Sequence, residues 1–494
     1  MKRNFLVRVV LVLTAILLLI AAAGSQSMMA AGRSPDKHWS ALERVPQFQE
    51  RLAAAGFSLH EGTVGYMDAV KECCEGNLMD TLGNNPWPST YVIPQGLTPP
   101  EYLQPFRPWV WQLREDEAIV LIGQTPPPAA YFSYGTFVAF LPGNRNKVAV
   151  PVGDGFNNLT ISTNGPDPFN RPLVYIITGH RKTEQRVRAA ALAAGYPASI
   201  INVETVSPVI APLGIGPKGS LMFLLHRVTI AEDPDALIEY IKNPPYKVFR
   251  VTPNPVGAAP VLDPDPQPVP ILRVRGTGHT EMELYPALQR LRQAILKEYA
   301  GTPHRMLDTH VFAGGRRSAE KPYAGLQRGL DVLGATRDTN YLATYPNFML
   351  RDGVDEFAIV YGVNHQATGK ATYASFSAYA DTARMFGLAT TYSPDFGDSA
   401  RQYLPDDPDA GKLYAWKIAR HCTEGEPYCM EVNQPVFEDM WGEPYDCLPP
   451  LDLNSEEMWL AFRTYLEPAT KTGPDDNELI YDQVIYFGPY FETP

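Results

Sequence analysis

The chain has 494 residues, a net charge of −12 and 19% charged residues. An acidic chain does not present the basic surface that attracts nucleic acids or anionic membranes, so neither is expected as a partner. The length exceeds what one hydrophobic core supports and predicts two domains of about 200 residues each.

The segment 1–24 has the layout of a secretory signal peptide. Three basic residues (Lys2, Arg3 and Arg8) precede an apolar run that ends in small residues. The alternative is an uncleaved membrane anchor, because the run approaches the ~18 residues that span a bilayer. Both interpretations place the bulk of the chain outside the cytoplasm, either secreted or periplasmic. The membrane is a partner only if this segment stays attached.

The next stretch, 35–252, predicts a helix followed by strands with one further helix. Apolar residues recur at helical spacing over 40–55, and the stretch 183–194 is rich in Arg and Ala and is followed by Gly195 and Pro197, which end a helix. Alternating or continuous apolar runs predict strands at 117–122, 131–140, 173–178, 221–230 and 247–251. Seven prolines between 253 and 270 then predict an extended linker.

The stretch 271–494 repeats this pattern. A helix is predicted over 283–299, with strands at 356–361, 371–379, 413–419, 458–466 and 483–487. DEAIV, which begins at Asp116, recurs as DEFAIV at Asp355, and the numbers of Glu117 and Glu356 differ by 356 − 117 = 239. Three more blocks recur in the same order at similar offsets, as expected for an internal duplication. The sequence therefore predicts an α+β protein made of two tandem β-rich units, each an antiparallel sheet or sandwich with short helices.

The cysteines support an exported protein. There are five, and Cys422 and Cys429 flank a short loop, which makes them the preferred disulfide. Cys447 is a competing partner for either of them.

One loop of the second unit carries polar groups that its counterpart lacks. GQTPPPAAY follows the first strand of the first unit, whereas GVNHQATGKATY in the second unit contains His365, Lys370 and Tyr373. Histidine and lysine are suited to acid–base work or to holding an anion, and functional residues often lie on loops. The alternative is a polar hairpin loop in which Gly369 permits the turn.

Other candidate residues lie outside this loop. Arg420 and His421 end a strand, as do His180 and Arg181 in the first unit, and this recurrence also fits a structural role. Arg227 and Arg463 occupy matched strand positions, where Glu232 and Glu467 are expected as carboxylate partners. A metal site is an alternative that lacks a recognised ligand spacing; its ligands would be His279, Glu281, His304 and His310.

Two functions remain open. The first is a cofactor-independent extracytoplasmic hydrolase or lyase that acts on a small or polar substrate in a cleft. His365 would be its acid or base, Lys370 and Arg420 would hold an anionic group, and Tyr373 or His421 would assist. No dinucleotide, Walker or haem motif is present, so no cofactor is expected. The second is a non-enzymatic exported protein that binds a small molecule or polar polymer, or belongs to the cell envelope. Convergence of His365 and His421 would favour the enzyme.

Overall fold

The computed structural model describes residues 40–74, 90–95, 110–143, 147–255, 259–312, 322–330, 332–353, 355–380, 385–433, 444, 446 and 451–489. The predicted signal peptide and Cys447 lie outside these ranges. Within them, no helix is both long enough and apolar enough to cross a membrane.

The protein has an α+β fold. The described residues form six α-helices: α2 (Val45–Ala54), α3 (Ala69–Cys74), α4 (Arg181–Ala193), α5 (Pro234–Lys242), α6 (Tyr285–Glu298) and α8 (Pro322–Arg328). The strands of the first half are β1 (Phe57–Met67), β2 (Thr90–Gln95), β3 (Ala118–Gln124), β4 (Ala129–Phe140), β5 (Val150–Pro151), β6 (Phe156–Asn157), β7 (Pro172–Thr178), β8 (Ile201–Thr205), β9 (Leu221–Ala231) and β10 (Tyr246–Pro253). Those of the second half are β11 (His304–Val311), β12 (Leu342–Tyr345), β13 (Phe357–Val363), β14 (Tyr373–Ala380), β15 (Phe386–Tyr392), β16 (Leu413–Ala419), β17 (Cys429–Glu431), β18 (Met458–Tyr465) and β19 (Gln483–Phe487).

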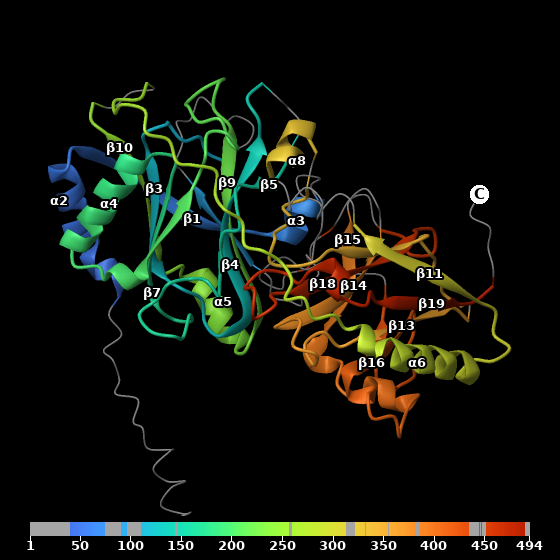
Figure 1. Cartoon of the computed structure of the whole chain (residues 1–494). Coiled ribbons are helices and arrows are strands. Elements are labelled where there is room, and N and C mark those ends of the chain that lie inside the picture. Colours follow the sequence, from blue (N-terminus) through green and yellow to red (C-terminus); the bar gives the residue numbers. More distant parts are fainter. Residues whose placement is uncertain are drawn as a thin grey trace, which may run out of the picture.

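The two halves lie side by side, and each contains one large sheet (Figure 1). The first sheet runs β5-β4-β9-β2-β1-β10-β3-β7-β8, and the second runs β15-β14-β18-β12-β11-β19-β13-β16-β17. When the strands of each half are counted along the chain, with β6 left out because it lies off the path, the two sheets have the same strand order. All pairings along them are antiparallel except the last of each path, β7–β8 and β16–β17, which are parallel.

Each central strand is buried on both faces, which explains its continuous apolar sequence. In β3, Ile119 and Leu121 face the core inside the curved first sheet, whereas Val120 and Ile122 face a second core beneath α2 and α4. This division follows from the alternation of side chains along a strand. In the second half α6 covers the corresponding outer face, over β13 and β16 (Figure 1).

The halves exchange short helices across their junction. Cys73 and Cys74 of α3 belong to the inner core of the second half, and Leu326 of α8 belongs to the inner core of the first. Figure 1 shows α3 and α8 together between the two sheets. Each core is therefore completed by the other half. The domain boundaries predicted from the sequence remain a prediction.

All ten predicted strands and the helices α2, α4 and α6 are present, with small shifts of their bounds. Helix α5 was not predicted. Its start is set by Asp233, whose carboxylate accepts the backbone N–H groups of Asp235 and Ala236, and Pro234 follows at the first helical position. The strands β1 and β11 were not predicted either, because their sequences mix polar and apolar residues without clear alternation.

The proline-rich linker is fixed to the first half. Gln267 donates its backbone N–H to the carbonyl of Gly179 at 2.8 Å, and Arg181 pairs with Asp265 at 2.7 Å. His180 caps α4 and contacts the carbonyl of Asp263 through Nε2 at 2.9 Å. The strand–helix junction of the first half thus has a structural role.

The predicted disulfide between Cys422 and Cys429 is present. It closes the short connection between β16 and β17, at the place where the first half uses α4 to join β7 to β8. The two halves therefore close the same parallel pairing by different means.

Candidate functional site

His365 lies just beyond the end of β13 and is only 1% exposed. Its Nδ1 lies 2.9 Å from Oε1 of Glu281, which also accepts the hydroxyl of Thr368 at 2.6 Å. Nε2 is buried and has no hydrogen-bond partner. Burial lowers the pKa of His365, but the charge and hydrogen bond of Glu281 outweigh it, and the pKa is raised overall.

Lys370 is held by two carboxylates, those of Glu467 and Glu478. Its Nζ donates to Glu467 at 2.9 Å, to Glu478 at 2.5 Å and to the hydroxyl of Thr277 at 3.0 Å. Burial opposes the charged form, but the two glutamates raise the pKa of Lys370 overall. The lysine therefore stays protonated and occupied, which makes it unsuited to act as a base.

Tyr373 lies in an aromatic contact between the halves. Its ring stacks on Tyr465 with 4.6 Å between centroids and lies 6.4 Å from the ring of Tyr131 in the first half. All three rings are buried. Tyr373 therefore packs the junction.

His421 and Arg420 lie at the other end of the sheet. Val363 pairs with Leu413 and Phe357 pairs with Ala419, so a whole strand separates them from His365, or about 20 Å at ~3.4 Å per residue. The side chain of His421 is 67% exposed and contacts Asp352 at 2.8 Å. Arg420 is buried, and its Nε and Nη1 have no hydrogen-bond partner. The five predicted residues thus do not form one site.

The alternative metal ligands do not converge either. Glu281 is committed to His365, whereas His279, His304 and His310 are exposed. His304 and His310 lie at the two ends of β11, about 20 Å apart. Among the residues that the structure describes, no group of three or more histidine, cysteine or acidic side chains could hold a metal ion.

A cavity lies where the two halves meet. Its volume is about 50 Å³. Its lining combines one arginine from each half with aromatic and apolar residues of the second: Arg227, Phe312, Val332, Leu333, Gly334, Ala335, Tyr341, Leu342, Met385, Trp459, Ala461, Phe462, Arg463 and Tyr465. No acidic side chain is among them.

The cavity walls are built from stacked aromatic rings and two arginines. Trp459 stacks on Tyr379 at 4.6 Å and on Phe312 at 5.8 Å. The guanidinium of Arg463 lies 5.0 Å from the ring centroid of Tyr341, and Arg227 donates to the carbonyl of Gly334. The hydroxyl of Tyr341 accepts the backbone N–H of Thr336 at 2.8 Å, and burial raises the pKa of Tyr341 to about 12.

The sequence predicts carboxylate partners for both arginines within their own units, Glu232 for Arg227 and Glu467 for Arg463. Glu467 instead pairs with Lys370, and Glu232 lines a separate groove beside α5. The sequence does indicate that the two arginines correspond to each other. Their numbers differ by 463 − 227 = 236, which is close to the offsets of the other repeated blocks. That both would face one cavity required the arrangement of the halves.

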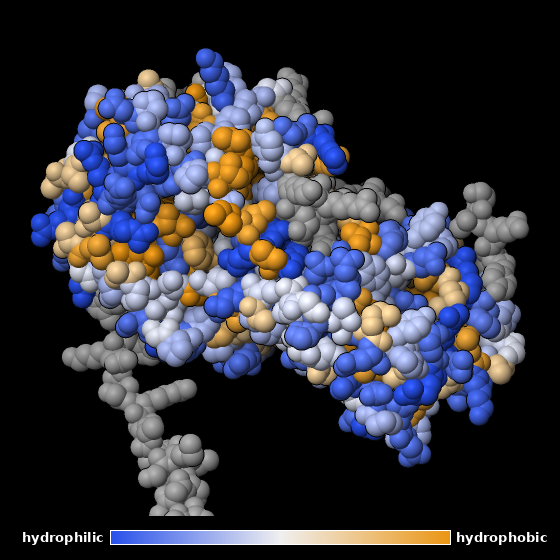
Figure 2. Space-filling view, in the orientation of Figure 1, coloured by the Kyte–Doolittle hydropathy of each residue, from blue (hydrophilic) through white to orange (hydrophobic). Residues whose placement is uncertain are grey.

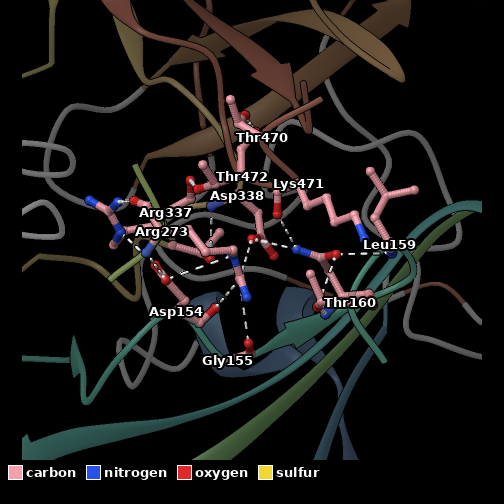
Figure 3. Close-up of polar contacts among 12 residues, drawn as sticks. Asp154, Gly155, Leu159, Thr160, Arg273, Arg337, Asp338, Thr470, Lys471 and Thr472 are labelled. Atoms are coloured by element: carbon pink, nitrogen blue, oxygen red, sulfur yellow. Dashed lines mark hydrogen bonds and ion pairs between the residues drawn. The ribbon is translucent and has the colours of Figure 1, made fainter. Parts of the chain in front are cut away.

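A buried polar network next to this cavity joins the halves (Figure 3). Asp154 accepts Nε of Arg337 at 2.6 Å and the backbone N–H of Arg273 at 2.6 Å. Asp338 accepts the hydroxyl of Tyr131 at 2.8 Å and the amide of Asn157 at 2.8 Å. Burial raises the pKa of Asp338. These contacts tie the first half to the second half.

Arg227 connects this network to the cavity. It also lines a second, smaller space of about 10 Å³, together with Asp154 and Asp338. On the face that Figure 2 shows, apolar and polar residues are interspersed, with the larger apolar areas over the first half. The cavity between the halves is therefore the best candidate site among the described residues.

No family model and no curated protein matches the chain. Among solved structures, it is similar to the VPA0106 protein from Vibrio parahaemolyticus, with 11% identity over 90% of this chain and 95% of that chain and a TM-score of 0.36. It is also similar to an uncharacterised protein from Burkholderia cenocepacia, with 10% identity over 94% of this chain and 93% of that chain and a TM-score of 0.36. Both similarities are too weak to support a conclusion about function.

Proposed function

We propose that this is an exported, non-enzymatic ligand-binding protein whose site is the cavity between its two halves. The observation that carries the proposal is the lining of this cavity: arginines from both halves face it beside stacked aromatic rings. Junctions between domains favour small-molecule sites, and aromatic walls with a few polar groups are typical of them.

Internal duplication is part of this proposal. The shared strand order supports it, and so does the backbone. Ala149 and Met385 both have left-handed conformations, as do Ile230 and Leu466, and the two pairs have the same offset in residue number (385 − 149 = 236 and 466 − 230 = 236). Such conformations are uncommon outside glycine, so their recurrence at one offset favours two copies of one unit.

An extracytoplasmic location is also proposed. The disulfide between Cys422 and Cys429 supports it, because disulfides persist in oxidising compartments. A small or polar ligand fits the cavity better than nucleic acid, which the acidic charge disfavours.

A hydrolase or lyase at His365 is the second candidate. One observation favours it: Glu281 orients the imidazole through Nδ1 while Nε2 lacks a partner, as in an oriented general base. The burial of His365 and the distance to His421 weigh against it, so we place it second.

The proposal is tested by filling the cavity. Ala461→Val adds two methyl groups to a strand residue that lines it. We expect the full chain to bind at least one compound of a chemically diverse small-molecule panel, measured by calorimetry, and Ala461→Val to bind it at least tenfold more weakly. The aliphatic addition leaves the strand intact because β-branched residues suit strands.

Ala389→Val is the matched control. Ala389 lies on β15 of the same sheet, is half-buried and does not line the cavity. This variant should bind like the unmodified chain. Equal loss in both variants, or no binding by the unmodified chain, would overturn the proposal.

A further inference from the structure

The chemistry of the cavity wall also indicates what it holds. Two guanidinium groups face it, and none of its lining residues is acidic. Arginine stays protonated at any physiological pH and presents a planar fork of donors that matches carboxylate-type oxygens. An anion placed there would meet positive charge from both halves of the chain.

A third donor points to the same class of ligand. The hydroxyl of Tyr341 accepts the N–H of Thr336 at 2.8 Å, so its own proton remains for donation to a ligand. Because the phenol keeps this proton over the physiological range, the group acts as a donor. Three donors of this kind favour an acceptor-only group such as an oxyanion.

The size of the cavity limits the ligand further. A volume of about 50 Å³ has room for roughly four water molecules at about 10–15 Å³ each. That is the size of formate, acetate, nitrate or bicarbonate. A planar anion of four non-hydrogen atoms fills less of this volume than a tetrahedral anion such as sulfate, which has five, so the size of the cavity favours the planar group.

We propose that the cavity binds a small planar oxyanion, a carboxylate or a trigonal inorganic anion of about four non-hydrogen atoms, between Arg227 and Arg463. This inference rests on the proposed ligand-binding function and specifies its ligand class. So small a ligand binds with a Kd on the order of tens of micromolar at best, given the limit on binding energy per atom.

The experiment is calorimetry on the full chain at low ionic strength, with sodium acetate, sodium nitrate, sodium sulfate and neutral acetamide as probes. Acetamide has nearly the shape of acetate but no charge. We expect acetate or nitrate to bind, sulfate to bind at least fivefold more weakly, and acetamide to give no measurable binding.

Three variants locate the site. Arg463→Gln and Arg227→Gln should each weaken anion binding at least tenfold. Tyr341→Phe removes only one hydroxyl, keeps the ring and should weaken binding at least threefold, so it serves if an arginine variant does not fold. Arg305→Gln is the control, because Arg305 lies 5.1 Å over the ring of Tyr486 in the same half but outside the cavity. Its affinity should change less than twofold.

The outcomes separate the two proposals. Equal binding of acetamide and acetate would overturn the anion inference and leave the ligand-binding function standing. Binding of other panel compounds, sensitive to Ala461→Val, without binding of either planar anion would do the same. Anion binding that survives the Arg463, Arg227 and Tyr341 changes would overturn the assignment to this cavity.

Discussion

Two deeply buried histidines, one in each half of the molecule, behave in opposite ways. His226 in β9 and His365 after β13 are both 1% exposed. The ring of His226 stacks on Tyr134 at 4.1 Å, neither of its nitrogens has a hydrogen-bond partner, and burial lowers its pKa to about 3. The pKa of His365 is raised because Glu281 pairs with its Nδ1.

The comparison shows that burial alone does not decide the charge of a histidine: the partner does. Folding lowers the pKa of His226 and raises that of His365, so the two histidines change the free energy of unfolding with pH in opposite directions. In the unfolded chain this histidine takes up a proton near pH 6.5, whereas in the folded protein His226 stays neutral until the pH approaches about 3. The free energy of unfolding therefore falls as the pH drops from 6.5 toward 3. The contribution of His365 is complete below pH 6.5 and is lost as the pH rises through its raised pKa.

The most destabilising change is expected at Lys370 in the second half, where one lysine pairs with two buried glutamates. Lys370→Met would leave Glu467 and Glu478 buried without their cation, at a cost of about 3–5 kcal/mol in the free energy of unfolding. Chemical denaturation measures it. Lys247→Met is the control, because its ion pair with Glu61 is 42% and 45% exposed and should contribute at most about 1 kcal/mol. Similar costs for both variants would contradict the structural role of Lys370.

His365→Ala should cost about 3 kcal/mol, because it leaves the Glu281 carboxylate buried and unpaired. This outcome differs from that of a purely catalytic histidine, whose removal leaves stability nearly unchanged. His421→Ala is the control: the side chain is 67% exposed, and a change within about 0.5 kcal/mol is expected. Thermal and chemical unfolding of both variants would show whether His365 is structural.

Removal of the disulfide tests the different closures of the two sheets. Replacing both Cys422 and Cys429 with serine opens a loop of sequence separation 7 and should cost about 2–3 kcal/mol through the unfolded state. Hydrogen exchange should show the loss first at β17, because the disulfide replaces the helix that supports β8 in the first half. Unchanged protection at β17 would show that its pairing with β16 is sufficient.

The weakest effect concerns pH. His226→Phe introduces the residue that the second half has at the same offset, Phe462 (462 − 226 = 236). Between pH 6.5 and 5 the unmodified chain should lose up to about 1.4 kcal/mol per pH unit through His226, or about 2 kcal/mol in total. Over the same pH range the His226→Phe variant should lose about 2 kcal/mol less free energy of unfolding than the unmodified chain. Denaturation at pH 7 and pH 5 measures the difference, and equal slopes would contradict the lowered pKa.

Much of the fold was predictable from local patterns. The apolar runs at 413–419 and 483–487 correspond to β16 and β19 with the predicted bounds. The mixed sequence of β1, FSLHEGTVGYM, gives no clear alternation and was missed. The candidate functional residues were harder to predict. The side chains of His365 and Lys370 can do acid–base chemistry, but they are paired with glutamates that lie far away in the sequence: Glu281, Glu467 and Glu478.

Local sequence was enough to specify the strands with clear apolar runs, the helices α2, α4 and α6 and the preferred disulfide, because each depends on side chains close in the chain. Which charges are neutralised and which surfaces meet became clear only in three dimensions. The fold pairs Lys370 with glutamates from distant parts of the chain and exchanges α3 and α8 between the cores. It also brings Arg227 and Arg463 to one cavity. Burial and charge pairing depend on such distant contacts, so no local pattern specifies them.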